Sequence, residues 1–192
     1  GQPDYESADN TECILELTER EQVFIFEQIP EKPVPSLLRG FSAPVKLVYP
    51  YTSAELAFLM SHDNDGFNRW DASQQLGLKV LQELVNNILQ QQAISPQSIS
   101  HQPAMQLDHQ LIAAYRVLLQ DDTLDPAMVA LMLELPGENY LAEQSDIAYP
   151  DAIHQARQFT RKTLANELRR ELLDIYLRHQ PDGKYQPIAA AI

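Results

Sequence analysis

Residues 68–92 have the sequence NRWDASQQLGLKVLQELVNNILQQQ, and the spacing of their apolar residues predicts one long helix. Apolar side chains recur at every third or fourth position, which places them along a single stripe of an α-helix. The stripe consists of Leu76, Val80, Leu81, Leu84, Val85 and Ile88. Such a stripe is stabilised by burial against other elements, and the neighbouring sequence predicts helices to cover it.

Two shorter helices are predicted on either side of the long one. Thr52 and Glu55 form a capping box, in which each side chain bonds to the backbone of the other, so a helix begins there and ends near His62. Asp108 can cap a second helix that continues through Leu119. No strand pattern separates these helices, which favours helix packed on helix.

Proline marks the start of two further predicted helices. Asp125–Pro126 is a strong helix start, because Asp accepts from free backbone N–H groups and Pro fits the first turn. Tyr149–Asp151 opens a last long helix that ends near His179, and residues 185–192 resemble the first turn of another helix. Turns or loops are predicted at residues 63–66, 95–106, 136–137 and 181–183. We therefore expect residues 50–192 to form an array of antiparallel helix pairs.

Residues 1–49 carry strand signals instead. Cys13, Leu15 and Leu17 alternate with polar neighbours apart from Ile14, and residues 45–49 alternate again. Val23–Phe26 is a run of β-branched and aromatic residues. Residues 19–21 would connect the first two strands, while the proline-rich residues 30–44 should be irregular. A sandwich needs about seven strands, and only three or four are predicted here. The expected fold class is α+β, predominantly α, with a partial β-sandwich at 1–49 and a helical domain at 50–192.

Composition excludes several classes of partner. The formal net charge is -13, and the acidic residues are scattered, which opposes binding to nucleic acid or to an anionic membrane surface. A single cysteine, Cys13, cannot form an internal disulfide and suits a reducing compartment, so we expect a cytoplasmic protein. We expect Cys13 to be a buried, inert thiol within a strand. The chain opens on Gly1 without Met or a signal-peptide pattern, as expected for a piece of a longer protein.

No catalytic, cofactor-binding or metal-binding residue is predicted in this chain. The five histidines lack the H-E-x-x-H spacing that places two zinc ligands on one helix face; they are His62, His101, His109, His154 and His179. The turn at 63–66 lacks the glutamate that a calcium loop requires, so a helix-capping turn is expected. A dispersed Ser–His–Asp triad stays open, although no G-x-S-x-G motif is present. Trp70 is expected to anchor the core rather than to stack on a ligand.

Three stretches carry a more specific signal. They are Pro33–Leu47 (PVPSLLRGFSAPVKL), Phe67–Ala72 (FNRWDA), and a discontinuous third stretch made of Leu124–Ala127, Leu135–Pro136, Tyr140–Gln144, Asp151–His154 and Ala156–Arg157. In order and spacing they resemble the bacterial aminopeptidase N family of gluzincin-type zinc aminopeptidases. The resemblance spans roughly residues 22–185.

The resemblance implies a role within a larger enzyme. Members of that family remove N-terminal residues from peptides with a catalytic domain that holds zinc, a general base and a Gly-x-Met-Glu-Asn loop. None of those residues has a matching position here. The chain resembles the end of the small β-sandwich and the start of the C-terminal helical domain, which closes over the catalytic cleft in the family.

The expected function is therefore a non-catalytic segment of a zinc-dependent aminopeptidase. Zinc and peptide substrates would belong to the parent protein, and the catalytic domain of the same chain would be the neighbour of this segment. The isolated chain should be inactive, and its unpaired β portion or terminal residues could self-associate. The alternative is a free-standing helical adaptor that binds partner proteins through a groove.

Overall fold

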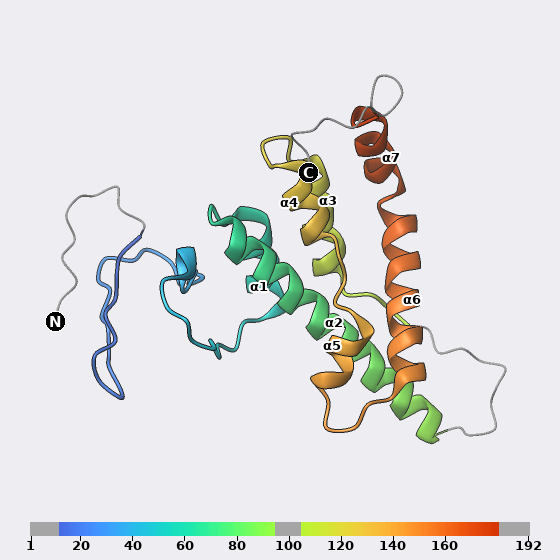
Figure 1. Ribbon diagram of the computed structural model, residues 1–192, viewed down its shortest axis with the longest axis horizontal. Coiled ribbons are helices and arrows are strands. Elements are labelled where there is room, and N and C mark those ends of the chain that lie inside the picture. Colours follow the sequence, from blue (N-terminus) through green and yellow to red (C-terminus); the bar gives the residue numbers. More distant parts are fainter. Residues whose placement is uncertain (1–11, 95–104, 181–192) are drawn as a thin grey trace, which may run out of the picture. The chain divides into compact units, whose positions relative to one another are not determined.

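The computed structural model describes residues 12–94 and 105–180 (Figure 1). The chain divides into two compact units, Gly1–Pro35 and Ser36–Ile192, and each is considered by itself. The described part of the second unit contains one 3-10 helix and seven α-helices. They are η1 Arg39–Phe41, α1 Ser53–His62, α2 Gly66–Ile94, α3 His109–Gln120, α4 Pro126–Met132, α5 Glu138–Glu143, α6 Pro150–Glu167 and α7 Arg169–Arg178.

Side-chain caps start three of these helices where the sequence predicts them. The Thr52 hydroxyl accepts from the backbone N–H of Glu55 at 3.2 Å, and the Glu55 carboxylate accepts from the backbone N–H of Thr52 at 2.8 Å. Asp108 caps α3 by accepting from the N–H of Gln110 at 2.8 Å. Asp125 caps α4 through two backbone N–H groups. These caps bond the free N–H groups of each first turn, which fixes where the helices begin.

Helix α2 is the central element of the second unit. It packs against α1, α4 and α6 and also contacts α3 and α5 (Figure 1). Five residues of the predicted stripe are buried, and only Val85 lies at the edge of the stripe. The buried ones are Leu76, Val80, Leu81, Leu84 and Ile88. The apolar stripe of residues 68–92 therefore lies in the core, as predicted.

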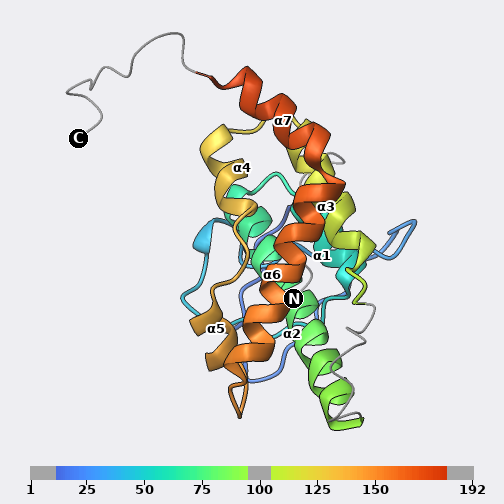
Figure 2. The same cartoon turned by 90° about the vertical axis from the view of Figure 1, so that its right-hand side faces the viewer.

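Two features of the helical region differ from the prediction. Helix α4 ends at Met132, and a separate helix, α5, begins after Gly137. Gly137 has no side chain that could cap α5, so the sequence contains no capping signal for this helix. The last predicted helix is two helices, α6 and α7, which follow one another at Leu168 (Figure 2). Leu168 leaves helical geometry at φ -109° and ψ 16° and is buried at 1% exposure. Burial of this leucine, rather than a helix-breaking residue, marks the break.

The predicted β unit is not confirmed. Within residues 12–50 the structure assigns no strand, although the chain does bend at residues 19–21, where a connection was expected. The apolar residues of the predicted strands are largely exposed; they include Ile14, Val23, Ile25, Val45 and Val48. Isolated hairpins are marginal in water because a strand needs neighbours to pair its backbone and cover its apolar face. The expectation of a buried Cys13 is wrong for the same reason, since this cysteine is exposed.

Residues 36–49 group with the helical unit rather than with the residues before them. The sequence-based boundary at residues 49–50 stays a prediction. The expected terminal helix turn at 185–192 and His101 lie outside the described residues. Among the described helices, none combines the length and apolar composition that a membrane crossing requires.

Candidate functional site

The four histidines in the described part of the chain are surface residues that lie far from one another in the sequence. His62, His109, His154 and His179 are all exposed. His154 lies 3.0 Å from Glu138, and His179, directly after α7, contacts the backbone oxygen of Ile175 in that helix. In residues 12–94 and 105–180 no three His, Cys, Asp or Glu side chains are grouped so that they could hold a metal ion.

The turn between α1 and α2 is held by its own carboxylates. Asp63 accepts from the backbone N–H of Asp65 at 2.9 Å, and Asp65 accepts from the backbone N–H of Asn68 at 2.9 Å. The second bond caps the first turn of α2. The prediction of a helix-capping turn is confirmed by these bonds.

A polar junction joins this turn to the segment before α1. Arg39 Nη1 lies 2.5 Å from Asp63 Oδ1, and the Ser36 hydroxyl donates to Asp63 Oδ2 at 2.5 Å. Arg39 Nη2 also donates to the side chain of Asn64. The Asn68 amide donates to the Ser36 hydroxyl at 2.8 Å. We refer to Ser36, Arg39, Asp63, Asn64 and Asn68 as the Arg39–Asp63 junction.

The junction restrains a strained piece of backbone. Leu38 and Phe41 have φ of 56°, and the intervening Gly40 has φ of 60°. A left-handed conformation costs about 1–3 kcal/mol for a residue with a side chain and persists only where the surroundings impose it. Here the Gly40 N–H donates to Asp65 at 3.0 Å, and Asn68 donates to the carbonyl of Leu37 at 3.0 Å.

The junction also sets the charge state of Asp63, which is buried. Burial alone would raise the pKa of the Asp63 carboxyl group. The hydrogen bonds from Ser36, the Asp65 backbone and Arg39, together with the charge of Arg39, outweigh that effect and hold the pKa below its ordinary value. Asp63 is therefore an ionised partner of Arg39.

Three aromatic side chains from the same two segments, η1 and the start of α2, contact one another in series. The Phe41 and Phe67 ring centroids lie 3.8 Å apart, and those of Phe67 and Trp70 lie 5.6 Å apart. Trp70 is only partly buried, so the expectation that it anchors the core is wrong. The register of α2 turns Arg69 inward instead and leaves Trp70 stacked against Phe67.

Buried Arg69 connects three helices. Its Nε and Nη2 atoms donate to the backbone oxygens of Met60 and Ser61 at 3.0 and 3.1 Å. These two carbonyl groups belong to the last turn of α1, where carbonyl oxygens have no hydrogen-bond donor within their own helix. Arg69 Nη2 also lies 3.6 Å from Asp121, at the C-terminal end of α3. The side chain thus fastens α1 to α2 and α3.

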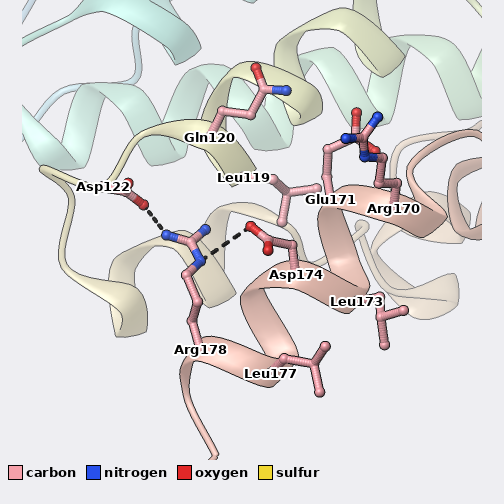
Figure 3. Close-up of a pocket in the computed structure, with 9 residues that line it drawn as sticks. All are labelled: Leu119, Gln120, Asp122, Arg170, Glu171, Leu173, Asp174, Leu177 and Arg178. Carbon is pink, nitrogen blue, oxygen red and sulfur yellow. Dashed lines mark hydrogen bonds and ion pairs between the residues drawn. The ribbon is translucent and has the colours of Figure 1, made fainter.

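An open groove of about 810 Å³ lies between the end of α3 and α7 (Figure 3). Leu119 and Gln120 line it from α3, and the remaining lining residues come from the loop after α3 and from α7. Leu173 and Leu177 are 53% and 60% exposed. Helix α7 buries none of its residues in the described part of the chain.

Paired charges flank the groove. Arg178 extends from α7 to Asp122 and to Asp174, which lies 3.3 Å away (Figure 3). Arg116 of α3 donates to Glu171 of α7 at 2.8 Å. The Arg116–Glu171 pair joins α3 to α7, and the Arg178–Asp122 pair joins α7 to the loop after α3, while Leu173 and Leu177 stay exposed.

The described residues do not form a recognisable nucleophilic centre. No serine, threonine or cysteine among them is hydrogen-bonded to a histidine, so the described part of the chain offers no support for a dispersed triad. The Arg39–Asp63 junction and the α3–α7 groove were missed by sequence reasoning. Ser36, Arg39 and Asn68 lie within the stretches at 33–47 and 67–72, but Asp63 lies in neither, so no sequence signal pairs it with Arg39.

Comparison with protein families divides the chain in two. Residues 3–50 match the family described as Domain of unknown function (DUF3458) Ig-like fold. Residues 12–50, the described part of this range, carry no assigned strand. Residues 53–192 match the family described as Domain of unknown function (DUF3458_C) ARM repeats.

Several individual proteins similar to this chain are named aminopeptidase N. The chain is 41% identical to aminopeptidase N of Escherichia coli (strain K12) over 163 residues, covering 85% of this chain and 18% of that protein. It is 34% identical to aminopeptidase N of Caulobacter vibrioides over 182 residues, covering 95% of this chain and 19% of the relative. The chain therefore spans less than a fifth of the length of these relatives.

A solved structure shares the arrangement of the helices. The crystal structure of Legionella pneumophila aminopeptidase A in complex with aspartic acid superposes with a TM-score of 0.62 and 32% identity, over 84% of this chain and 17% of that one. Homology to aminopeptidases is thus supported by sequence and by fold. Since the match over residues 53–192 covers most of the chain, the chain belongs to the DUF3458_C family of ARM repeats.

Proposed function

We propose that this chain is a non-catalytic segment of a zinc-dependent aminopeptidase, and that its helices form part of the wall over the catalytic cleft. The observation that carries the proposal is the 41% identity to aminopeptidase N across 85% of this chain, which is only 18% of that relative. In the proposal, the zinc ligands, general base and amine-binding residues lie elsewhere in the parent, which acts in the cytoplasm.

The proposed wall would act by excluding water and large substrates. A metal-dependent hydrolysis benefits from an enclosed site, because electrostatic interactions strengthen when bulk water is removed. Helices joined by buried groups such as Arg69 would give a stiff wall. Peptides with free amino termini would then be the substrates of the parent, and its catalytic domain would be the direct neighbour of this chain.

The first test uses the isolated chain. Purified and dialysed 192-residue protein should contain no stoichiometric zinc and should not hydrolyse an aminoacyl p-nitroanilide with or without added zinc. Retained zinc together with turnover that a chelator abolishes would contradict a non-catalytic role.

The second test addresses the wall. In the parent protein, Arg69→Ala should loosen the array and raise the ratio of kcat/KM for a long peptide to that for an aminoacyl reporter. Arg161→Ala, which changes an exposed arginine of α6, is the matched control. An unchanged ratio in a folded Arg69→Ala variant would refute the wall while leaving the non-catalytic role intact.

A free-standing adaptor is the second candidate, and the α3–α7 groove is the observation that favours it. The length of the natural polypeptide separates the two functions. An antibody raised against this chain should detect a protein several times larger than 21.8 kDa in cell extract. Detection of a protein of about 21.8 kDa instead would favour the adaptor.

Self-association of the isolated chain is a separate proposal. Exposed apolar residues such as Ile14 and Val23 support it, and light scattering over a range of concentrations would measure it.

A further inference from the structure

The lysine and arginine side chains of the described helices fall into two groups. Five of them donate to a carboxylate or a backbone carbonyl within the chain; they are Arg69, Lys79, Arg116, Arg157 and Arg178. The other four are exposed, and their side chains have no hydrogen bond or ion pair in the described part of the chain; they are Arg161, Lys162, Arg169 and Arg170. All four lie within residues 161–170, so the unpaired cations of these helices are concentrated where α6 ends and α7 begins.

Lys162 and Arg169 lie on one line along the two helices. They are seven positions apart, which corresponds to two helical turns. The backbone hydrogen bonds that join Leu168 to the residues four positions before and after it are both 2.9 Å long, so the helical spacing continues across the break. Exposed Ala165 and Asn166 lie between the two cations. We refer to Lys162, Ala165, Asn166 and Arg169 as the Lys162–Arg169 face.

The chain does not neutralise this face with its own carboxylates in the described structure. Helix α6 has no acidic residue between Asp151 and Glu167. Glu167 is five positions after Lys162 and projects from another side of the helix, because neighbours on a helix surface are three or four positions apart. The Glu171 carboxylate accepts from Arg116 of α3 at 2.8 Å instead. On a chain with a formal net charge of -13, the face is therefore a local excess of positive charge.

The length of the face favours a short acidic ligand. Seven helical residues span about 10 Å, a distance that an extended peptide covers with about three residues. A nucleic acid or a membrane would reach beyond the face to Asp151 in α6 and Asp174 in α7 and to the acidic surface of the chain, which would repel it. A short peptide avoids that repulsion, because salt screens charges that are more than about 8 Å away.

We propose that the Lys162–Arg169 face docks a short acidic segment of a partner polypeptide. One carboxylate of the segment pairs with the Lys162 ammonium group, and a second pairs with the Arg169 guanidinium, whose fork can bind both oxygens of a carboxylate. The small side chain of Ala165 leaves room for the backbone of the segment between the two pairs. Both pairs stay exposed to water, so the complex is weak and sensitive to salt. The inference goes beyond the proposed wall and does not depend on peptidase activity.

Fluorescence anisotropy of a labelled octaglutamate peptide, titrated with the 192-residue chain, tests the proposal. We expect saturable binding in low salt that weakens as sodium chloride is added. Lys162→Glu with Arg169→Glu should weaken binding by about tenfold or more, because two attractive pairs become repulsive. The matched control is Lys46→Glu with Arg20→Glu, which makes the same change in residue types and net charge at two other exposed positions. The control should weaken binding by less than about threefold, because distant surface charges are screened.

Carbodiimide coupling locates the bound peptide, because this reagent condenses a carboxylate with a nearby lysine amine. Mass spectrometry should find the peptide on Lys162 in preference to exposed Lys46. Helical circular dichroism of every variant shows whether weaker binding comes from a failure to fold. The proposal is overturned by a lack of saturable binding up to about 1 mM peptide. Equal losses in the two double variants, or coupling spread evenly over the lysines, overturn it as well.

Single-stranded DNA and phosphatidylserine vesicles are the competing anions in the same titration. Either of them should bind more weakly than octaglutamate, because each extends beyond the face onto acidic surface. Tighter binding of DNA or vesicles that is lost in Lys162→Glu with Arg169→Glu would assign the face to that polyanion and would overturn the acidic peptide as its ligand.

Discussion

Arg39 Nη1 lies 2.5 Å from Asp63 Oδ1, so two residues that are 24 positions apart form an ion pair inside the Arg39–Asp63 junction. The Asp63 side chain is almost completely buried, whereas the Arg39 side chain is 21% exposed. The pair ties the strained residues 38–41 to the turn between α1 and α2. Loss of either partner would release that segment and leave a charge unpaired.

The ion pair predicts an acid-sensitive step in stability. Because the pKa of Asp63 is lowered in the folded protein, its contribution is full above the unfolded value of about 3.9 and is lost as the pH falls through the folded pKa. Urea unfolding at pH values from 7 to about 3 should therefore show decreasing stability.

Asp63→Asn is the variant that isolates this contribution. It should lower the stability at pH 7 by about 2 kcal/mol and reduce the dependence on pH, because the amide cannot lose or gain the charge. Asp146→Asn, at an exposed position, is the control and should keep the wild-type slope. An unchanged slope in Asp63→Asn would show that the junction does not stabilise the fold.

Arg69 should be among the most sensitive positions of the helical unit. Arg69→Ala removes two hydrogen bonds to the carbonyls at the end of α1 and leaves Asp121 without this partner. We expect a loss of about 2–4 kcal/mol in the free energy of unfolding, measured in urea. Arg69→Lys should recover only part of it, because an ammonium group cannot reproduce the fork of a guanidinium.

Gly77 is required by a close approach between α2 and the residues before α5. A Cβ atom at this position would lie 2.9 Å from Cδ of Pro136, whose ring cannot easily move. Gly77→Ala should therefore lower stability by about 1 kcal/mol, although alanine favours helices.

Gly66 is the matched control within α2. A Cβ atom there would lie 3.4 Å from the flexible end of Met128, so Gly66→Ala should leave stability unchanged or raise it. Thermal unfolding of the two variants compares them directly. Equal melting temperatures would contradict the contact with Pro136.

We expect the hydroxyl group of Tyr115 to lower the stability of the fold. Its oxygen is buried without a hydrogen-bond partner in the described structure, and burial raises the pKa of the phenol above its usual value. Tyr115→Phe should raise the free energy of unfolding by about 1 kcal/mol, or the melting temperature by about 2–4 °C. Tyr140→Phe, at a 46% exposed position, should change neither quantity. Destabilisation by Tyr115→Phe would reveal an essential hydroxyl partner.

Local chemistry made much of the helical unit predictable. A cap operates within three or four residues, so Thr52, Asp108 and Asp125 each marked a helix start before any packing was known. The periodic stripe of α2 was equally informative, because a face that is apolar over several turns must be buried. The family resemblance was also contained in the sequence, and the relatives confirm it.

Contacts between distant residues were not predictable in this way. Nothing near Leu168 breaks a helix, and its departure from helical geometry accompanies burial in the assembled unit. Arg69 rather than Trp70 faces inward because Arg69 lies seven residues before Leu76, in line with the buried stripe of α2. The carbonyls of α1 that bind its buried guanidinium come from another helix, and no local pattern predicts them. The strand-like pattern within residues 13–49 was insufficient to predict strands. A strand forms only when a neighbouring strand pairs with its backbone, and no strand is assigned among the described residues. Periodicity and caps thus determined the helices, whereas long-range packing determined the Arg39–Asp63 junction and the α3–α7 groove.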